Sequence, residues 1–447
     1  MAEAIERPRH TAPFKARRTL NWLVLGFTYA SMYMARYNFG FANKSLSDTY
    51  GWNKAQVGAI ISSATLVYGI AALFNGPLAD RFGGRRAMII GAVGATVFNV
   101  AFGLGAYLGV LGTGGLLLGY LATVWSLNMY FQSYSALALI KVNSGWFHVT
   151  ERGVFSAVFG SMIQTGRFLV FLLLATPFVV HLPWPFMFFI PAVIVGLMAV
   201  LTYLVVQDAP ERAGLGAFDP QDATSGDTEK ITLGYVARKV FTNPIALTIA
   251  AAEFCTGLVR QGFEQWFPRY MQEVQHLQLS NPIFQRNALA VVGAGIVGAF
   301  IAGFASDKLF GNRRPPVAFL GYLIIVICLT IIWKAPSMEL VIVAFMLNSL
   351  GISMVHSMLS GTASMDFGGQ RAAATAAGMF DGMQYLGQSF VGWGLGSLLD
   401  RYGWGAWGSS MLGFAALGAV LMLFLWNARP RQHRAMSGGS AAQPSGH

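Results

Sequence analysis

The sequence is poor in charged residues and almost free of cysteine. Asp, Glu, Lys and Arg make up 11% of its 447 residues, whereas about a quarter of the residues in a soluble domain are charged. The two cysteines, Cys255 and Cys328, fall in apolar segments and lack the spacing of a disulfide framework or a metal site. The low content of charged residues excludes water as the main solvent of the chain. From the cysteines we expect no metal site, and we expect no cofactor.

Long apolar runs dominate the chain instead. Hydrophobic residues make up 55% of it, and the mean hydropathy is +0.52. Runs such as Leu20 to Phe41 and Val57 to Leu78 come close to the roughly 20 residues that a membrane helix needs. The first run follows a basic stretch, as in a signal peptide. Because many similar runs follow and no small-residue cleavage site does, we interpret it as the first membrane helix.

The apolar runs predict an all-α membrane protein with twelve transmembrane helices in the lipid bilayer. We place these helices at 20–42, 55–79, 87–108, 113–140, 152–178, 185–206, 245–269, 287–305, 317–334, 339–362, 373–397 and 406–426. The sequence shows no nucleophile–base arrangement and no P-loop, so we do not expect an enzyme.

The formal net charge of +11 is typical either of nucleic-acid binding or of a membrane topology signal. Beyond the N-terminus, the basic residues of the connections are Arg81, Arg85, Arg86, Lys141, Arg152, Arg238, Lys239, Lys308, Arg313, Arg314, Arg371, Arg429, Arg431 and Arg434. They recur in alternate connections, and this pattern predicts a multi-pass inner-membrane protein with both termini in the cytoplasm. No contiguous basic and aromatic patch is present, so we expect no nucleic-acid partner. We also expect a monomer.

Related residues recur along the chain at a nearly constant offset. The pairs are Asp80 and Asp307, Arg152 and Arg371, and Arg36 and Arg260, which lie 227, 219 and 224 positions apart. A constant offset indicates a duplicated architecture. We therefore predict a basic cytoplasmic N-terminus at 1–19, pseudo-symmetric six-helix bundles at 20–207 and 245–427, a cytoplasmic linker at 208–244 and a disordered cytoplasmic tail at 428–447.

The segment from Gly76 to Arg86 has the pattern Gly-x-x-x-Asp-Arg-x-Gly followed by paired arginines. It resembles the signature of the major facilitator superfamily. An acidic residue at a helix end beside a basic loop can bond to neighbouring helix ends and close the cytoplasmic side in one state. Alternatively, the loop only fixes topology and its Asp is incidental. For the first interpretation, the predicted gating residues are Asp80, Arg81, Arg85, Arg152, Asp307, Lys308 and Arg371.

Arg36 and Arg260 lie inside apolar segments, which costs about 2.5 to 3.5 kcal/mol each on insertion scales. Tyr29, Tyr33 and Arg36 are four and three positions apart and share one helix face, which presents donors to an oxyanion. The repeat is expected to bring Arg260 opposite Arg36, where a phosphate dianion would accept bidentate bonds from both. In the alternative, each arginine pairs with an internal carboxylate; the candidates are Glu253, Glu264 and Asp381.

Segments along nearly the whole chain resemble the organophosphate:phosphate antiporter family, which includes the glycerol-3-phosphate and hexose-phosphate transporters. They are Tyr33 to Phe39, Tyr68-Gly69, Trp146 to Gly153, Arg260 to Tyr270 and Thr375 to Gly387. The resemblance implies an exchange of organophosphate for inorganic phosphate by alternating access. It also implies that the substrate phosphate is bound by Arg36 and Arg260, helped by Tyr29, Tyr33, Tyr68 and Tyr385.

The chain departs from this family at three positions. The glycerol-3-phosphate carrier has a lysine in the second helix, a histidine in the fifth and a lysine after the first arginine, where this chain has Ala72, Ile163 and Tyr37. The substrates of the known carriers, and a proton-linked change of their affinity for substrate, therefore do not carry over directly to this chain. The predicted helices add polar groups of their own, which are Asn128, Gln132, Gln164, Arg167, His356, Asp381 and Gln384.

Two of these added groups have alternative interpretations. Arg167 either holds a second anionic group of the substrate or pairs with Asp381. His356 is either a proton-coupling group or a packed, hydrogen-bonded histidine. We include Gln132, Gln164, Arg167, His356 and Asp381 in the predicted substrate site.

We therefore predict a secondary transporter that exchanges a small anionic organophosphate for inorganic phosphate. One alternative is a carboxylate or phosphonate carrier of the same fold, because the family lysine and histidine are missing. A different class is a transporter-like sensor, which would bind a sugar phosphate and signal to a membrane kinase with little transport.

Overall fold

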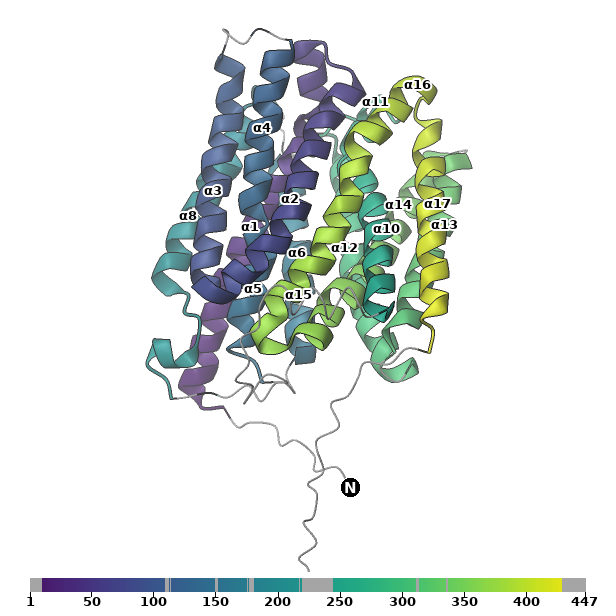
Figure 1. Cartoon of the computed structure of the whole chain (residues 1–447). Helices are drawn as coiled ribbons and strands as arrows, with labels where there is room; N and C mark the ends of the chain where they lie inside the picture. Colours follow the sequence, from purple (N-terminus) through teal and green to yellow (C-terminus); the bar gives the residue numbers. More distant parts are fainter. Residues whose placement is uncertain are drawn as a thin grey trace, which may run out of the picture.

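The computed structural model describes residues 10–108, 112, 114–148, 152–174, 176, 181–216, 218, 244–310, 313–334 and 337–427, without the side chains of 152–161, 307, 361–373 and 376. All regular elements in these ranges are helices (Figure 1), so the all-α prediction is confirmed. Most of the predicted linker and the whole predicted tail lie outside the described residues.

Most residues of the first half of the chain lie in long helices. They are α1 (Ala12–Tyr50), α2 (Lys54–Phe82), α3 (Gly84–Leu104), α4 (Gly115–Gln132), α5 (Tyr134–Ser144), α6 (Arg152–Leu174) and α8 (Phe186–Val205), with short 3₁₀ turns η1 (Gly105–Tyr107) and η4 (Pro210–Ala213). α4 and α5 together correspond to the predicted helix 113–140, which the structure interrupts at Ser133.

The second half repeats this organisation. Its helices are α10 (Pro244–Glu264), α11 (Phe267–Glu273), α12 (Pro282–Phe304), α13 (Arg314–Lys334), α14 (Met338–His356), α15 (Ala363–Phe390), α16 (Gly396–Tyr402) and α17 (Gly405–Phe424), with π-helical segments η5 (Ala305–Leu309), η6 (Ser357–Thr362) and η7 (Val391–Leu395). α10 with α11, and α15 with η7 and α16, each correspond to one predicted helix. With consecutive elements joined in this way, the described part matches the twelve predicted helices.

α1 is much longer than the predicted helix 20–42. It begins after Thr11, whose side chain accepts a bond from the backbone of Phe14, and it ends at Gly51, which has a left-handed φ of 67°. Its first turns carry basic residues and its last turns carry polar ones. The apolar run therefore marks only the part of α1 that crosses the hydrocarbon, because capping and not hydropathy decides where a helix ends.

Seven helices of the described part are long and apolar enough to cross a membrane: α2, α3, α8, α12, α13, α14 and α17. α1, α10 and α15 are not among them, because they carry Arg36, Arg260 and Asp381 besides other polar residues. Every residue of α1 from Thr28 to Asn43 is buried, as is every residue of α10 from Cys255 to Phe263. The least apolar helices are thus the central ones.

The helices form two bundles that meet along two seams. Within the first bundle, α3 packs against α4 and α8; within the second, α13 packs against α14 and α17. Between the bundles, α2 packs along α15, and α6 packs against α12. Figure 1 shows α2 and α15 side by side in the centre of the molecule.

Glycines bring helix backbones into direct contact. At the α2–α15 seam, a Cβ placed on Gly69 would lie 3.0 Å from the carbonyl oxygen of Gly382. Within the second bundle, a Cβ on Gly298 of α12 would lie 2.4 Å from the carbonyl oxygen of Leu350 of α14. Contacts of this kind are typical of membrane helix pairs, because van der Waals packing of small residues drives their association.

We predict that Gly298→Ala destabilises the protein by about 1–3 kcal/mol, because the new methyl group overlaps a backbone atom that cannot move alone. The matched control is Gly293→Ala in the same helix, where a Cβ meets nothing within 4 Å; it should be neutral or stabilising by up to about 1 kcal/mol. The measurement is the thermal midpoint of the purified protein in detergent. Equal midpoints for the two variants would contradict this packing.

Candidate functional site

Arg36 lies in the middle of α1 and is 3% exposed. Its Nη1 donates to the hydroxyl of Tyr385 at 2.7 Å, and its Nη2 donates to Gln132 Oε1 at 3.1 Å and to Ser135 Oγ at 3.0 Å. Among the residues that the structure describes, its Nε has no hydrogen-bond partner, and no carboxylate forms an ion pair with this guanidinium within 4.0 Å. All three partners are neutral. Arg36 is therefore a buried cation without a direct ion pair.

Arg260 on α10 is equally buried, with 3% of its surface exposed, but its partners differ. Its Nε donates to Glu264 Oε1 at 3.1 Å, one turn further along the same helix. Its Nη1 donates to Gln384 Oε1 at 3.2 Å and lies 3.4 Å from His356 Nε2, and its Nη2 donates to the Tyr37 hydroxyl at 3.3 Å. For Arg260, the structure thus contains the predicted alternative, an internal ion pair.

Glu264 also binds a second arginine. Arg167 Nη2 of α6 lies 3.0 Å from Glu264 Oε1, and the hydroxyl of Tyr37 donates to Glu264 Oε2. Arg167 comes from the first bundle and Glu264 from the second, so this ion pair crosses between them. Of the two alternatives for Arg167, the pairing with Asp381 is wrong, because its carboxylate partner is Glu264. A role for Arg167 in binding an anionic group of the substrate stays a prediction. The sequence did not show which helix lay opposite α6.

One cavity collects most of the predicted substrate-binding residues. Its empty space, open solvent included, is about 430 Å³, and its polar lining consists of Tyr29, Tyr33, Arg36, Tyr68, Arg260, His356, Ser360, Asp381 and Tyr385. The Arg36 guanidinium carbon lies 5.1 Å from the ring centres of both Tyr33 and Tyr68. The rings of Tyr68 and Tyr385 stack at 3.5 Å across the two bundles. The cavity therefore offers two cations and four phenol groups to a ligand.

The remaining predicted residues support this cavity from outside it. Gln132 holds Arg36 and also donates to the Met32 carbonyl at 3.1 Å. Gln164 on α6 donates to Ser353 Oγ on α14 at 2.8 Å, which is a contact between the bundles. Asn128 donates to the Ala35 carbonyl at 3.1 Å.

Two residues that contact the arginines of the cavity were not predicted as binding residues. Tyr37 bonds to both Arg260 and Glu264, although the sequence indicated only the loss of a family lysine there. Ser135 follows the interruption at Ser133, which turns its hydroxyl toward Arg36. Neither position carries a sequence signal, because each role depends on a residue of another helix.

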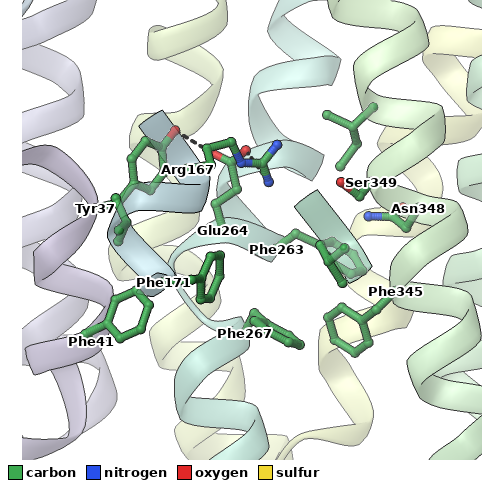
Figure 2. A pocket seen from close by; sticks show the side chains of 13 residues that line it. Tyr37, Phe41, Arg167, Phe171, Phe263, Glu264, Phe267, Phe345, Asn348 and Ser349 are labelled. Atoms are coloured by element: carbon green, nitrogen blue, oxygen red, sulfur yellow. Dashed lines mark hydrogen bonds and ion pairs between the residues drawn. The ribbon is translucent and has the colours of Figure 1, made fainter. Parts of the chain in front are cut away.

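A second, mostly apolar cavity lies beyond Glu264. Its empty space, open solvent included, is about 530 Å³. Figure 2 shows its aromatic wall, which is formed by Phe41, Phe171, Phe263, Phe267 and Phe345, and shows Tyr37 bonded to Glu264 beside Arg167 at one edge. Because Arg260 lines the first cavity and Glu264 lines the second, their ion pair is part of the wall between the two.

The bundles are also joined at the ends of the helices, at one end through α11. Arg269 donates to Asn43 Oδ1 at 2.7 Å and to Ser47 Oγ at 3.0 Å, both on α1. Glu273 lies 3.2 Å from Lys54 Nζ on α2. This is the end at which α11 and α16 lie in Figure 1.

At the opposite end, Asp80 joins the bundles. Thr375 of α15 donates to Asp80 Oδ2 at 2.9 Å, and Lys141 Nζ lies 2.9 Å from Asp80 Oδ1. Of the other predicted gating residues, Arg85 bonds through its backbone to Asp208 at 2.7 Å, whereas Arg81 and Lys308 are exposed. The side chains of three further predicted gating residues lie outside the described residues; these are Arg152, Asp307 and Arg371.

A protein-family comparison identifies the class to which this fold and site belong. The model of the Major Facilitator Superfamily matches residues 25–392, so the chain belongs to this superfamily of membrane transport proteins. The chain is therefore an integral membrane protein and not an enzyme, as the sequence predicted.

Curated relatives match almost the whole chain. The "Glycerol-3-phosphate transporter" of Bacillus subtilis (strain 168) is 24% identical over 438 residues, covering 96% of this chain and 97% of the relative. A "Probable hexose phosphate transport protein" of Chlamydia pneumoniae is 26% identical over 431 residues, 91% of this chain and 90% of the relative. The "Membrane sensor protein UhpC" of Escherichia coli (strain K12) is 26% identical over 424 residues, 92% of each chain. The resemblance to organophosphate transporters is thus confirmed.

Solved structures share the fold. The xylose transporter XylE from E. coli, in a partially occluded inward open conformation, superposes with a TM-score of 0.66 at 15% identity, covering 92% of this chain and 99% of that chain. This likeness supports the two-bundle architecture alone.

We predict that Glu264→Gln destabilises the protein by about 3–5 kcal/mol, because it leaves Arg167 and Arg260 buried without a counter-charge. Arg167→Gln should cost less, since the pair of Arg260 and Glu264 remains. The double variant should be more stable than Glu264→Gln alone, because one uncompensated charge is removed. Thermal midpoints in detergent test this order, and a Glu264→Gln protein as stable as the wild type would contradict it.

Proposed function

We propose that the protein exchanges an organophosphate for inorganic phosphate across the membrane by alternating access. The observation that carries this proposal is the cavity between the bundles, which contains Arg36 and Arg260 and gives Arg36 only neutral partners. A buried guanidinium without a counter-charge is costly. An anion that enters the cavity removes this cost, so the empty site favours binding of an anion.

The geometry of the two side chains favours a phosphate group. A guanidinium presents its N–H donors in a planar fork, and a phosphate accepts such pairs of bonds through several oxygens. The hydroxyls of Tyr29, Tyr33 and Tyr385 provide further donors in the same cavity, whereas the Tyr68 hydroxyl donates to Asp381. The names of the curated relatives, a glycerol-3-phosphate transporter and a hexose phosphate transport protein, support the same substrate class.

The charge balance of the site supports exchange over one-way transport. The cavity and its wall contain three arginines, Arg36, Arg167 and Arg260, against two carboxylates, Glu264 and Asp381, which leaves one net positive charge. Reorienting the bundles around this empty, positively charged cavity would be unfavourable, whereas reorienting them around a bound anion would not. A returning phosphate therefore serves as the counter-substrate.

The contacts at the two ends of the helices support the transport cycle. Opening toward one side requires loss of the bond between Thr375 and Asp80, and opening toward the other requires loss of the bonds of Arg269 and Lys54. We propose that the Asp80 end faces the cytoplasm, since the basic loops lie on that side. In the same proposal, the protein acts as a monomer.

A sensor is the second candidate function, because the relative UhpC is named a membrane sensor protein. A sensor would bind its ligand in the same cavity and show little flux, so measured transport separates the two candidates.

We predict that proteoliposomes loaded with inorganic phosphate take up external radiolabelled phosphate faster than unloaded proteoliposomes, because an occupied cavity reorients more readily. The initial rate of uptake is the measurement. Equal rates with and without internal phosphate would refute exchange, and binding without uptake in either case would favour the sensor.

We predict that Arg36→Lys and Arg260→Lys each weaken phosphate binding roughly 10- to 100-fold, since one or two charge-assisted bonds at about 1.5–3 kcal/mol are lost when the planar fork is replaced. Arg401→Lys is the matched control, because Arg401 is exposed on α16 outside the cavity. Calorimetric titration with phosphate measures the affinities. Unchanged affinity in both cavity variants would contradict the proposed phosphate site.

A further inference from the structure

Asp381 is a carboxylate in a cavity that is otherwise built for an anion. It lies on α15, one turn before Tyr385, and lines the same cavity as Arg36 and Arg260. Its hydrogen-bond donor is the Tyr68 hydroxyl, 3.2 Å from Oδ2. Among the residues that the structure describes, no Lys, Arg or His side chain lies within 4.0 Å of the Asp381 carboxylate. Asp381 therefore forms no direct ion pair, although Arg36 and Arg260 line the same cavity.

The surrounding polar groups cannot serve as its partner, because they already bond elsewhere. Gln384, one turn along α15, accepts from Arg260 and donates to Glu253 Oε2 at 2.9 Å. Its amide nitrogen also lies 3.0 Å from His356 Nδ1. Glu253 is fully buried behind Gln384 and is absent from the lining of the cavity.

We propose that the transported substrate is a zwitterion, with a phosphate or phosphonate group at Arg36 and Arg260 and an ammonium group at Asp381. The inference rests on the function proposed above and names its substrate class. A plain organophosphate would bring further negative charge into the cavity and leave Asp381 without an ion-pair partner, whereas an ammonium would pair with it.

The charges in the cavity and its wall agree with this assignment. Arg36, Arg167 and Arg260 together with Glu264 and Asp381 leave one net positive charge. A phosphate dianion reverses this to one net negative charge, and an ammonium on the same molecule restores neutrality. Ionisation of Glu253 would add a further negative charge and would only increase the preference for a cation.

The walls around Asp381 are also suited to an ammonium. Tyr68 and Tyr385 stack on each other beside it, and Tyr29 and Tyr33 line the same cavity. Aromatic faces attract cations through their quadrupole, as the contacts of Arg36 with two of these rings already show. An ammonium carries three donors, enough for the carboxylate and a phenol oxygen together.

The test compares matched pairs of compounds that differ only in an ammonium or a hydroxyl group. They are ethanolamine phosphate with 2-hydroxyethyl phosphate, and 3-aminopropyl phosphate with 3-hydroxypropyl phosphate. Affinities for the purified full-length protein are measured by calorimetry, with inorganic phosphate as the reference ligand. We expect the wild type to bind the amine of at least one pair ten or more times more tightly than the hydroxyl compound.

Asp381→Asn should reduce the ratio of the affinities for the amine and the hydroxyl compound to about threefold or less, because the amide keeps the shape of the side chain but loses its charge. Affinity for the hydroxyl compounds should be equal or higher in this variant. Ser389→Ala is the control on the same helix, since the Ser389 hydroxyl bonds only to the carbonyl of Leu386 outside the cavity; it should retain the full preference.

Two results would overturn the assignment. One is a wild type without preference for the amine in either pair, which needs no variant and is independent of folding. The other is an Asp381→Asn protein that keeps the preference. If phosphate and the hydroxyl compounds still bind in these cases, the proposed exchange function is retained and only the proposal of a zwitterionic substrate is refuted. If no compound binds, inorganic phosphate included, both proposals fail.

Discussion

The shared carboxylate of Glu264 holds the site together. It binds Arg260 of its own helix, which is buried, and Arg167 of the other bundle, whose side chain is 11% exposed, so two cations depend on one anion. In hydrocarbon, neither arginine would be stable alone. The ion pairs that join α6 to α10, and that form part of the wall between the two cavities, therefore depend on a single carboxylate. Arg36 lies outside this arrangement and has no carboxylate beside it.

This asymmetry is notable because Arg36 and Arg260 occupy equivalent positions in the repeat. The duplicated fold places both side chains at one cavity, but the local sequence then gives them different surroundings. Arg260 has Glu264 one turn away, whereas the equivalent turn of α1 offers Gly40. Pseudo-symmetry thus determines where the two cations lie, and the divergence of the halves determines which of them lacks an internal counter-ion.

Much of the fold and part of the candidate site could be predicted from the sequence. Apolar runs predicted twelve helices, and the spacing of Tyr29, Tyr33 and Arg36 predicted a shared face that the structure turns toward the cavity. The interruption at Ser133 and the pairing of Arg167 with Glu264 were not predicted. Hydropathy averages over a whole helix and misses a local break, and periodicity orders residues on one helix without showing which helix lies opposite.

The glycine contacts along α2 and α15 have a consequence for motion. Where Gly69 meets Gly382, backbone faces backbone, with the side chains of Leu73 and Leu386 beside the two glycines. On the same two helices, Tyr68 stacks on Tyr385 at 3.5 Å and donates to Asp381. A change of crossing angle at this seam must therefore disturb the aromatic stack and the bond to Asp381, besides the polar bonds at the helix ends. Because these side chains also line the cavity, movement of the bundles and occupation of the cavity are mechanically coupled.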